Sequence, residues 1–290
     1  MRYYESIQRS IDFIEENIDV DITLKEIAER SCFSLYHFHR IFQAVTGESV
    51  KEYIRKRRLS CAAKDLLYDK SKVIDIAFKY QYESAEAFSR AFSKAYGIPP
   101  LMFKKSNKKN IKVFERIDIM SLDTLNKKEG LNIRIVKKEQ FKVIGYELRT
   151  SWIDNKHAGE ISEFWSMYLG QKLRDAIPDK IDPVTELGMS MEHDEDGSFS
   201  YVIGFEVSSF DNVRRNMVKK TIPEATYAVL TIKGDDSRLI QEKIGEAWDY
   251  FFVHWLPGSG YKQAPSANFE VYDERTTRAG FEIDIYIPIN

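Results

Sequence analysis

An internal repeat constrains the fold of this 290-residue sequence more than any other feature. Residues 24–28 read Leu-x-x-Ile-Ala, and residues 73–77 read Val-x-x-Ile-Ala. Each copy continues with a serine, a Phe-x-x-x-Phe pair, an arginine and a glycine, which are Ser34, Phe38, Phe42, Arg40 and Gly47, then Ser84, Phe88, Phe92, Arg90 and Gly97. A short helix with a small residue, a turn and a second helix with a buried Phe-x-x-x-Phe face form a helix-turn-helix, so the sequence predicts two such units.

Two interpretations fit this repeat: a pair of helical hairpins in an all-α bundle, or a nucleic-acid-binding domain. Arg40 and Arg90 take equivalent outward positions on the two second helices, and residues 55–58 form a basic run between the copies. Lys and Arg outnumber Asp and Glu by five in residues 1–110, whereas the acidic residues lead by seven in residues 111–290. The duplicated unit and its positive balance favour nucleic-acid binding.

The second copy ends in a longer recognisable segment. Residues 88–100, Phe-Ser-Arg-Ala-Phe-Ser-Lys-Ala-Tyr-Gly-Ile-Pro-Pro, resemble the closing signature of the AraC/XylS family of transcription regulators. This resemblance covers residues 1–106 and implies an all-α domain that binds double-stranded DNA, with recognition helices at residues 34–42 and 84–92. The residues it places toward bases and phosphates are Tyr36, His39 and Arg40 in the first helix, and Ala85, Glu86, Ser89 and Arg90 in the second.

Local signals around the turns partly agree with this assignment. Thr23 and Glu26 form a Ser/Thr-x-x-Glu capping box, which predicts that a helix begins there. The family usually has a glycine four residues after the small alanine, but this chain has Cys32 and Gln81. A positive φ at such a residue costs about 1 kcal/mol, so we expect either a reshaped turn or local strain. The second recognition helix has few base-reading side chains, and we expect the first to supply most of the specificity.

The periodicity of the sequence changes after a polar stretch, residues 107–130, which we predict to be a linker. From residue 131 onward, apolar residues alternate as they do in strands, for example at residues 201–207 and 281–287. Two helical stretches interrupt the strands. The order of elements predicts an α+β domain at residues 131–290, made of two similar strand-helix-strand-strand halves.

This second half resembles the GyrI-like effector-binding domain that follows AraC-type DNA-binding domains in Rob-like regulators. The matching stretches are residues 222–229, residues 248–261, the Phe-Glu-Val-Tyr of residues 269–272, and residues 285–289. The resemblance implies a multidomain chain in which residues 131–290 bind a small-molecule effector.

The candidate ligand residues come from two strands near the end of the chain. Glu282, Asp284 and Tyr286 share one face of their strand, and Glu270 and Tyr272 share a face of theirs. From the pattern alone, such a face is either solvated surface or the floor of a cleft. The resemblance favours the cleft, with the glutamate of the Phe-Glu-x-Tyr strand at its base, and a lipophilic organic cation as the ligand. We expect the ligand-binding residues to be Glu270, Tyr272, Asp284, Tyr286 and Trp248.

The leading functional hypothesis is a one-chain transcription regulator whose effector domain changes its activity on DNA, with RNA polymerase as a further partner. One alternative is a small-molecule hydrolase in which Glu270 acts as general base. Another is sequestration of a toxic compound. The sequence has no GxSxG, HExxH, P-loop or GxGxxG motif, so we expect no enzyme and no cofactor.

Other features exclude further classes of protein. No apolar stretch reaches the roughly 18 to 20 residues of a membrane span, and the N-terminus has no signal-peptide pattern. Cys32 and Cys61 suit a reducing compartment, so we expect a cytoplasmic protein without membrane partners. The five histidines form no metal-ligating set, because His37 and His39 point to different sides of one helix and the rest are isolated.

Overall fold

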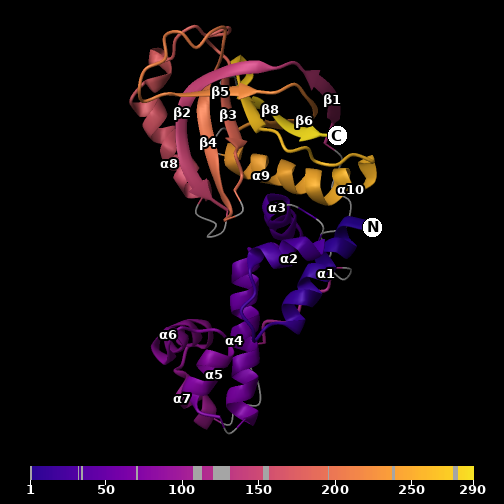
Figure 1. Cartoon of the computed structure of the whole chain (residues 1–290), viewed down its shortest axis with the longest axis vertical. Coiled ribbons are helices and arrows are strands. Elements are labelled where there is room, and N and C mark those ends of the chain that lie inside the picture. Colours follow the sequence, from indigo (N-terminus) through magenta and orange to yellow (C-terminus); the bar gives the residue numbers. More distant parts are fainter. Residues whose placement is uncertain are drawn as a thin grey trace. The chain divides into compact units, whose positions relative to one another are not determined.

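The computed structural model describes residues 2–31, 33, 35–69, 71–106, 113–119, 131–152, 157–194, 196–236, 239–276 and 280–290. It separates into two compact units, Met1–Leu122 and Asp123–Asn290 (Figure 1). The end of the DNA-binding domain at residue 106 and the start of the effector-binding domain at residue 131 stay predictions. Among the described helices, none combines the length and the apolar character that crossing a membrane requires.

The first unit is all-α, as predicted, and contains two helix-turn-helix pairs, α2–α3 and α5–α6. The four phenylalanines of the repeat are fully buried, which confirms the predicted Phe-x-x-x-Phe faces. The capping box is also present, because the backbone N–H of Thr23 donates to Glu26 and that of Glu26 donates to Thr23 Oγ1. The helices are α1 (Arg2–Glu16), α2 (Leu24–Ser31), α3 (Leu35–Thr46), α4 (Val50–Tyr68), α5 (Val73–Lys79), α6 (Ala85–Tyr96) and α7 (Pro100–Lys105).

The turn of the second pair carries the strain expected of a missing glycine. Gln81 has φ of 64°, in the left-handed region that glycine occupies at lower cost. Its side-chain amide donates a hydrogen bond of 2.7 Å to the carbonyl oxygen of Asp19, which helps to fix the turn. The corresponding residue of the first pair, Cys32, lies outside the described residues.

The long helix α4 is fastened to α1 by a buried ion pair. The guanidinium of Arg57 donates two hydrogen bonds of 2.7 Å to the carboxylate of Glu15, and the hydroxyl of Tyr53 donates a third of 2.6 Å. Arg57 also donates to the carbonyl oxygen of Phe114. Part of the predicted linker, residues 113–119, therefore contacts the helices of the first unit.

The basic run of residues 55–58, which the sequence associates with DNA, is engaged within the protein. Arg55 forms an ion pair with Glu52, and Lys56 forms one with Glu48. The guanidinium of Arg58 donates to the backbone oxygens of Ile18 and Val20. Most of this positive charge therefore supports packing around α4 and contributes less to a DNA-binding surface.

In its described residues, the second unit is an eight-stranded antiparallel sheet with two long helices, α8 (His157–Gly170) and α9 (Ile240–Tyr250). The strand order is β1-β6-β8-β7-β3-β4-β2-β5. The halves β2-α8-β3-β4 and β6-α9-β7-β8 repeat one arrangement, which confirms the predicted α+β fold. The strands are β1 (Ile133–Lys138), β2 (Phe141–Ser151), β3 (Glu186–Met191), β4 (Ser198–Val207), β5 (Val218–Ile222), β6 (Ala225–Gly234), β7 (Asn268–Tyr272) and β8 (Phe281–Ile289).

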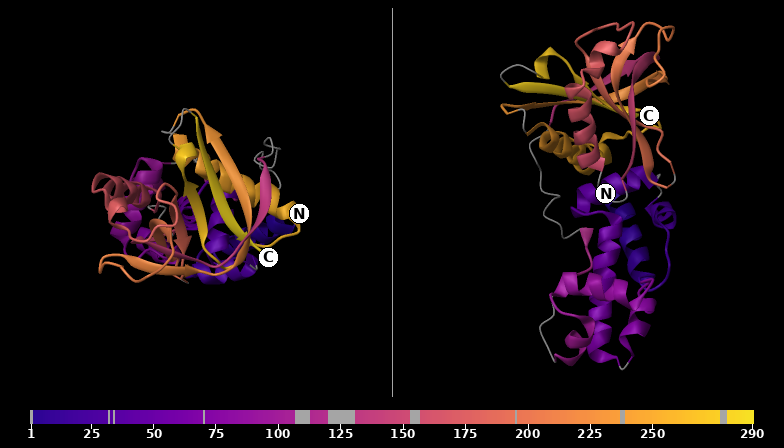
Figure 2. Two further views of the ribbon diagram at one scale, coloured as in Figure 1. Left: turned by 90° about the horizontal axis from the view of Figure 1, so that it is seen from above. Right: turned by 90° about the vertical axis from the view of Figure 1, so that its left-hand side faces the viewer.

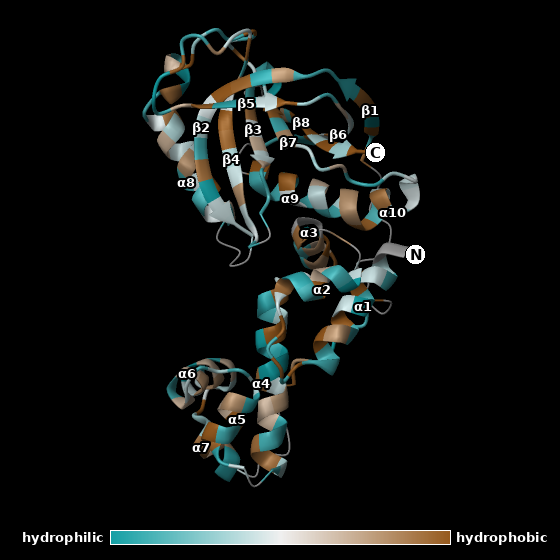
Figure 3. Cartoon of the chain, viewed as in Figure 1, coloured by the Kyte–Doolittle hydropathy of each residue, from teal (hydrophilic) through white to brown (hydrophobic). Residues whose placement is uncertain are grey.

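Short turns complete this unit: the 3₁₀ turns η3 (Leu173–Ala176) and η6 (Glu274–Thr276), the π-helical turn η5 (Phe251–Trp255) and the short α10 (Leu256–Ser259). Polar and apolar residues alternate along several strands (Figure 3). The sheet curls strongly (Figure 2), so that one of its faces packs against itself. Residues of β2, β3, β4, β5, β6 and β7 meet in that sheet-only core, among them Phe141, Met189, Val202, Ile222, Tyr227 and Phe269.

The opposite face of the sheet carries the helices. Trp165 and Tyr168 of α8 contact Tyr201 of β4 and Tyr146 of β2. Helix α9 packs against β6, and since Tyr227 and Val229 of β6 belong to the sheet-only core, α9 covers the alternate residues. We call this side of the sheet the helix-covered face.

Candidate functional site

The second recognition helix, α6, exposes the side chains predicted to meet DNA. Ser84 caps the helix, accepting a hydrogen bond of 3.1 Å from the backbone N–H of Ala87. Glu86 and Arg90 are exposed, and Ala85 and Ser89 are half-buried. The helix therefore presents a polar face with an acid, Glu86, in its first turn and a base, Arg90, near its centre.

The first recognition helix, α3, differs from that expectation. Arg40 is half-buried, and Tyr36 lies in α3 with a side chain outside the described part of the chain. His39 was expected to face DNA but is only 5% exposed, which corrects its predicted orientation. The physical reason is that α3 packs against α1, α2 and α4, so its buried stripe is wider than the two phenylalanines and includes His39.

Burial also changes the acid–base behaviour of His39. Its removal from water, together with the positive charge of Lys51, lowers the pKa of His39 to about 4. Nε2 of this imidazole is buried and has no hydrogen-bond partner among the described residues. His39 is therefore neutral near pH 7 and contributes to the core of the first helix-turn-helix.

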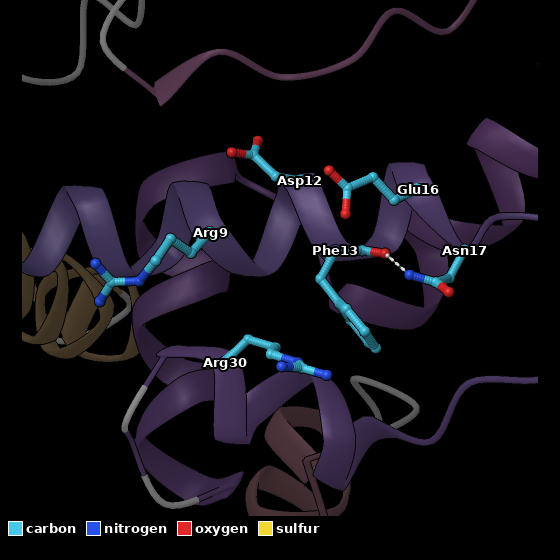
Figure 4. Close-up of a pocket in the computed structure, with 6 residues that line it drawn as sticks. All are labelled: Arg9, Asp12, Phe13, Glu16, Asn17 and Arg30. Atoms are coloured by element: carbon cyan, nitrogen blue, oxygen red, sulfur yellow. Dashed lines mark hydrogen bonds between the residues drawn. The ribbon is translucent and has the colours of Figure 1, made fainter.

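Helices α1 and α2 border a surface hollow that none of the predicted site residues lines. The guanidinium of Arg30 lies 4.6 Å from the centre of the Phe13 ring there (Figure 4). The side-chain amide of Asn17 donates to the carbonyl oxygen of Phe13. The hollow is lined by Arg9, Asp12, Phe13, Glu16, Asn17 and Arg30.

The register of the sheet divides the predicted ligand residues between its two faces. Glu270 pairs with Gly188 of β3 and Ile285 of β8, so Glu270 and Tyr272 lie on the helix-covered face. Asp284 pairs with Val271 instead, which places Asp284 and Tyr286 on the face of the sheet-only core. The expectation of one cleft containing both pairs is wrong, because alternation within a strand does not fix its register with the next.

Glu270 sits among aromatic groups on the helix-covered face. The hydroxyl of Tyr201 lies 3.4 Å from Glu270 Oε2 and accepts a hydrogen bond of 3.0 Å from the indole N–H of Trp165. The rings of Trp165 and Tyr272 have their centres 4.9 Å apart at 60°. A carboxylate is thus bordered by three aromatic side chains from α8, β4 and β7.

The phenols around Glu270 remain protonated at neutral pH. Burial raises the pKa of Tyr201 and of Tyr272 well above the ordinary value, and the negative charge of Glu270 raises both further. A protonated phenol can donate a hydrogen bond to a carboxylate. Glu270 can therefore accept a hydrogen bond from the Tyr201 hydroxyl, beside the rings of Trp165 and Tyr272.

A second carboxylate, Glu186, lies on the same face at the start of β3. It accepts a hydrogen bond of 3.0 Å from the hydroxyl of Tyr168 and lies 3.4 Å from Nε of Arg174. Glu186 is 6% exposed, and burial raises its pKa despite these two partners. In the register of β3 with β7, Glu186 pairs with Tyr272 and Gly188 pairs with Glu270. Glu186 and Glu270 are therefore diagonal neighbours on adjacent strands.

Asp284 belongs to an internal ion-pair network. It is 4% exposed and accepts hydrogen bonds from Arg134 at 2.7 Å, Arg275 at 2.9 Å and Thr231 at 2.6 Å. Burial alone would raise the pKa of Asp284, but these donors lower it. Asp284 is therefore already satisfied, and its neighbour Tyr286 stacks on Phe269 with the ring centres 4.5 Å apart.

Trp248 lies on α9 and is 7% exposed. Its ring is stacked with that of Phe252, with centres 5.9 Å apart and planes at 17°. Since α9 covers the β6 side of the helix-covered face, Trp248 shares that face with Glu270. Its contact with a ligand stays a prediction.

Several residues around Glu270 escaped the prediction: Trp165, Tyr201, Gly188 and Glu186. Tyr201 and Glu186 lie on strands whose place in the sheet depends on pairing across the two halves. One signal was available, because Gly188 interrupts the apolar strand β3 and an isolated glycine in a strand indicates close approach of another group. In the described part of the chain, no three His, Cys, Asp or Glu side chains gather as metal ligands.

Comparison with known proteins relates each unit to a family. The family of integron-associated effector binding proteins (Cass2) matches residues 134–289, and a helix-turn-helix domain family matches residues 27–106. An integron cassette protein from the mobile metagenome of Vibrio cholerae, known from a crystal structure, is 19% identical, with a TM-score of 0.40 over 55% of this chain and 95% of its own.

Two regulators are similar in sequence. The HTH-type transcriptional regulator YbfP of Bacillus subtilis (strain 168) is 49% identical over 100 residues, which are 34% of this chain and about a third (34%) of YbfP. The transcriptional regulator Rob of Salmonella typhimurium is 25% identical over 227 residues, covering 77% of this chain and 76% of Rob. The chain therefore belongs to the family of integron-associated effector binding proteins and joins that domain to an AraC-type helix-turn-helix domain, the arrangement of an AraC-family transcriptional regulator.

Proposed function

We propose that the first unit binds one site in double-stranded DNA, with α3 and α6 in successive major grooves about 34 Å apart. Three observations support this: the duplicated helix-turn-helix, the matching positions of Arg40 and Arg90, and the exposed polar face of α6. One chain then reads an asymmetric site without dimerising. Contact with RNA polymerase stays a prediction.

Arginine substitutions test the DNA interface. Arg40→Ala and Arg90→Ala should each weaken binding by about 1 to 3 kcal/mol if each arginine reads a base. The measurement is a titration with a DNA fragment that the wild-type protein selects from random sequences. Lys64→Ala removes one charge from an exposed position on α4 and serves as the control. Full binding by the Arg40→Ala/Arg90→Ala double variant would exclude this role for both helices.

For the second unit, we propose that the helix-covered face around Glu270 binds a lipophilic organic cation. The observation that carries this proposal is a half-buried carboxylate bordered by the Tyr201 hydroxyl and the rings of Trp165 and Tyr272. A carboxylate that loses hydration attracts a cation that lacks a strong hydration shell of its own. The aromatic faces add cation–π attraction.

A pair of ligands that match in shape and differ in charge tests the effector site. Glu270→Gln keeps the shape of the side chain and removes its charge, so benzyltrimethylammonium should lose about 1 to 3 kcal/mol of affinity. Its neutral isostere neopentylbenzene should lose little. Calorimetric titration of both compounds against both proteins gives the comparison. Equal losses for the two compounds would remove Glu270 from the site.

We assign no reaction to this site. The regulators among its relatives support a binding role. A bound cation should therefore be recovered unchanged after long incubation with the protein. The consequence of binding is a change in occupancy of the DNA site, which a footprint with and without ligand measures; turnover of the ligand would favour the hydrolase alternative.

A further inference from the structure

Gly188 occupies an unusual position at the centre of the sheet. It lies on β3, between Ile203 of β4 and Glu270 of β7. A Cβ atom at this residue would lie 2.4 Å from Tyr201 Oη, 3.1 Å from Glu270 Oε2 and 3.2 Å from Trp165 Cζ2. The atoms that crowd this glycine are those of the candidate effector site.

Backbone conformation does not explain the glycine. Gly188 is in a regular strand and is not among the glycines of positive φ, so any residue could adopt its backbone geometry. The requirement is space above the Cα atom. Glycine inside a strand commonly marks such a close approach.

The strand order shows why that space matters. Tyr201 is on β4 and Glu270 is on β7, and β3 lies between them. Adjacent strands are about 4.8 Å apart, so the Tyr201 hydroxyl can reach Glu270 only if the phenol ring lies across β3. It crosses β3 at Gly188, where no side chain stands in the way.

The phenol of Tyr201 has little room to move aside. Tyr201 is 5% exposed, and its oxygen is fixed by the hydrogen bond from the Trp165 indole. A methyl group on residue 188 would therefore displace a packed, hydrogen-bonded ring instead of a free chain end. The Tyr201 hydroxyl lies 3.4 Å from Glu270 and 3.0 Å from the Trp165 indole nitrogen. The longer contact, to Glu270, would therefore be lost first.

We propose that Gly188 is a positioning residue of the effector site: its missing side chain lets the Tyr201 hydroxyl reach the carboxylate of Glu270 and sets the orientation of that carboxylate toward the ligand. This inference rests on the proposed function of Glu270 where it concerns ligand affinity. The crowding of residue 188 by Tyr201 stands independently of any ligand.

The first arm of the test needs no ligand. In the full chain, Gly188→Ala should lower the thermal unfolding midpoint by about 5 °C, since a methyl group in a packed space strains the site. In a Tyr201→Phe background, which lacks the closest atom, the same substitution should lower the midpoint much less. Gly170→Ala, at a helix position with nothing within 4 Å, is the control and should not lower the midpoint, since alanine is favoured over glycine in a helix. Equal shifts in both backgrounds would overturn the proposal.

The second arm measures affinity for rhodamine 6G, a lipophilic cation, by fluorescence polarisation. Gly188→Ala should weaken binding at least tenfold, Gly170→Ala should not change it, and adding Gly188→Ala to Tyr201→Phe should cost less than threefold more. Unchanged affinity in Gly188→Ala would overturn the positioning role. If the midpoints show the coupling while Glu270→Gln binds the dye as well as the wild type, the crowding by Tyr201 holds and the proposed function of Glu270 fails instead.

Discussion

The two units bury acidic side chains in different ways. In the helical unit, Glu15 receives two parallel hydrogen bonds from one guanidinium and a third from Tyr53. On the helix-covered face of the sheet, Glu186 receives a hydrogen bond from Tyr168 and a more distant contact from Arg174, whose side chain is 37% exposed. Both carboxylates are buried or nearly so, but only the first has a full counter-charge at short range.

The pKa values follow this difference. Burial would raise the pKa of Glu15, but its hydrogen bonds and the charge of Arg57 lower it. Burial dominates for Glu186 and raises its pKa. A bidentate guanidinium thus compensates a buried carboxylate and makes it structural, whereas the single phenol and the more distant guanidinium at Glu186 leave part of its desolvation cost uncompensated. We expect a cationic ligand on the helix-covered face to satisfy that remainder.

Arg57→Ala is expected to give the largest effect. It leaves Glu15 buried without its guanidinium, and breaking a buried pair in this way costs about 3 kcal/mol or more. Urea unfolding of the full chain, followed by circular dichroism at 222 nm, measures the loss. Arg55→Ala breaks an ion pair between side chains that are 40% and 36% exposed and should cost less than about 0.5 kcal/mol. Similar losses in the two variants would contradict the assignment of Glu15 as structural.

Asp284→Asn should come next in size. It removes the negative charge shared by Arg134 and Arg275, whose side chains are 49% and 34% exposed, so solvent screening reduces the loss of unfolding free energy to about 2 kcal/mol. Affinity for rhodamine 6G should stay within a factor of two, because Asp284 lies on the opposite face from Glu270. Glu270→Gln should show the reverse: weaker binding with little change in stability. A tenfold loss of dye binding in a stable Asp284→Asn protein would show that the ligand binds the face of the sheet that carries Asp284, and not the helix-covered face.

The contrast between Asp284 and Glu270 also shows what the sequence could predict. Alternation along one strand correctly grouped Asp284 with Tyr286 and Glu270 with Tyr272. It could not predict the pairing of β7 with β8, and one step of register exchanges the two faces. The partners Tyr201 and Glu186 come from strands of the other half, so their position depends on the order of all eight strands.

In the helical unit, the periodicity of a single helix predicted more than the alternation of a single strand did in the sheet. The repeat predicted the buried phenylalanines and the outward Arg90 of α6, because one helix with one buried stripe decides both; the family resemblance added Glu86, which is also exposed. The family resemblance was wrong for the orientation of His39, since α3 contacts three other helices and its buried face is wider. Local pattern therefore predicts which residues share a face, and the number of neighbouring elements determines how wide the buried face is.

The smallest expected effect is a difference in the pH dependence of stability between the two kinds of buried acid. The pKa of Glu15 is lowered in the folded protein, so its contribution is present above the ordinary value of 4.5 and is lost as the pH falls below it. The pKa of Glu186 is raised from 4.5, so the folded protein retains that proton to higher pH than the unfolded chain does. Stability therefore declines as the pH rises from 4.5 through the folded pKa of Glu186.

Two glutamine variants separate these opposite slopes. Glu186→Gln should gain stability relative to the wild type as the pH rises from 4.5 toward 7, because it removes a carboxyl that must lose its proton in a buried site. Glu15→Gln should instead lose its disadvantage as the pH falls below 4.5, because the wild-type carboxylate is then protonated as well. Urea unfolding of the wild type and both variants at pH 3, 4, 5, 6 and 7 measures the two differences. If both differences changed with pH in the same direction, the phenol-bordered and arginine-paired acids would not differ in the way that their contacts indicate.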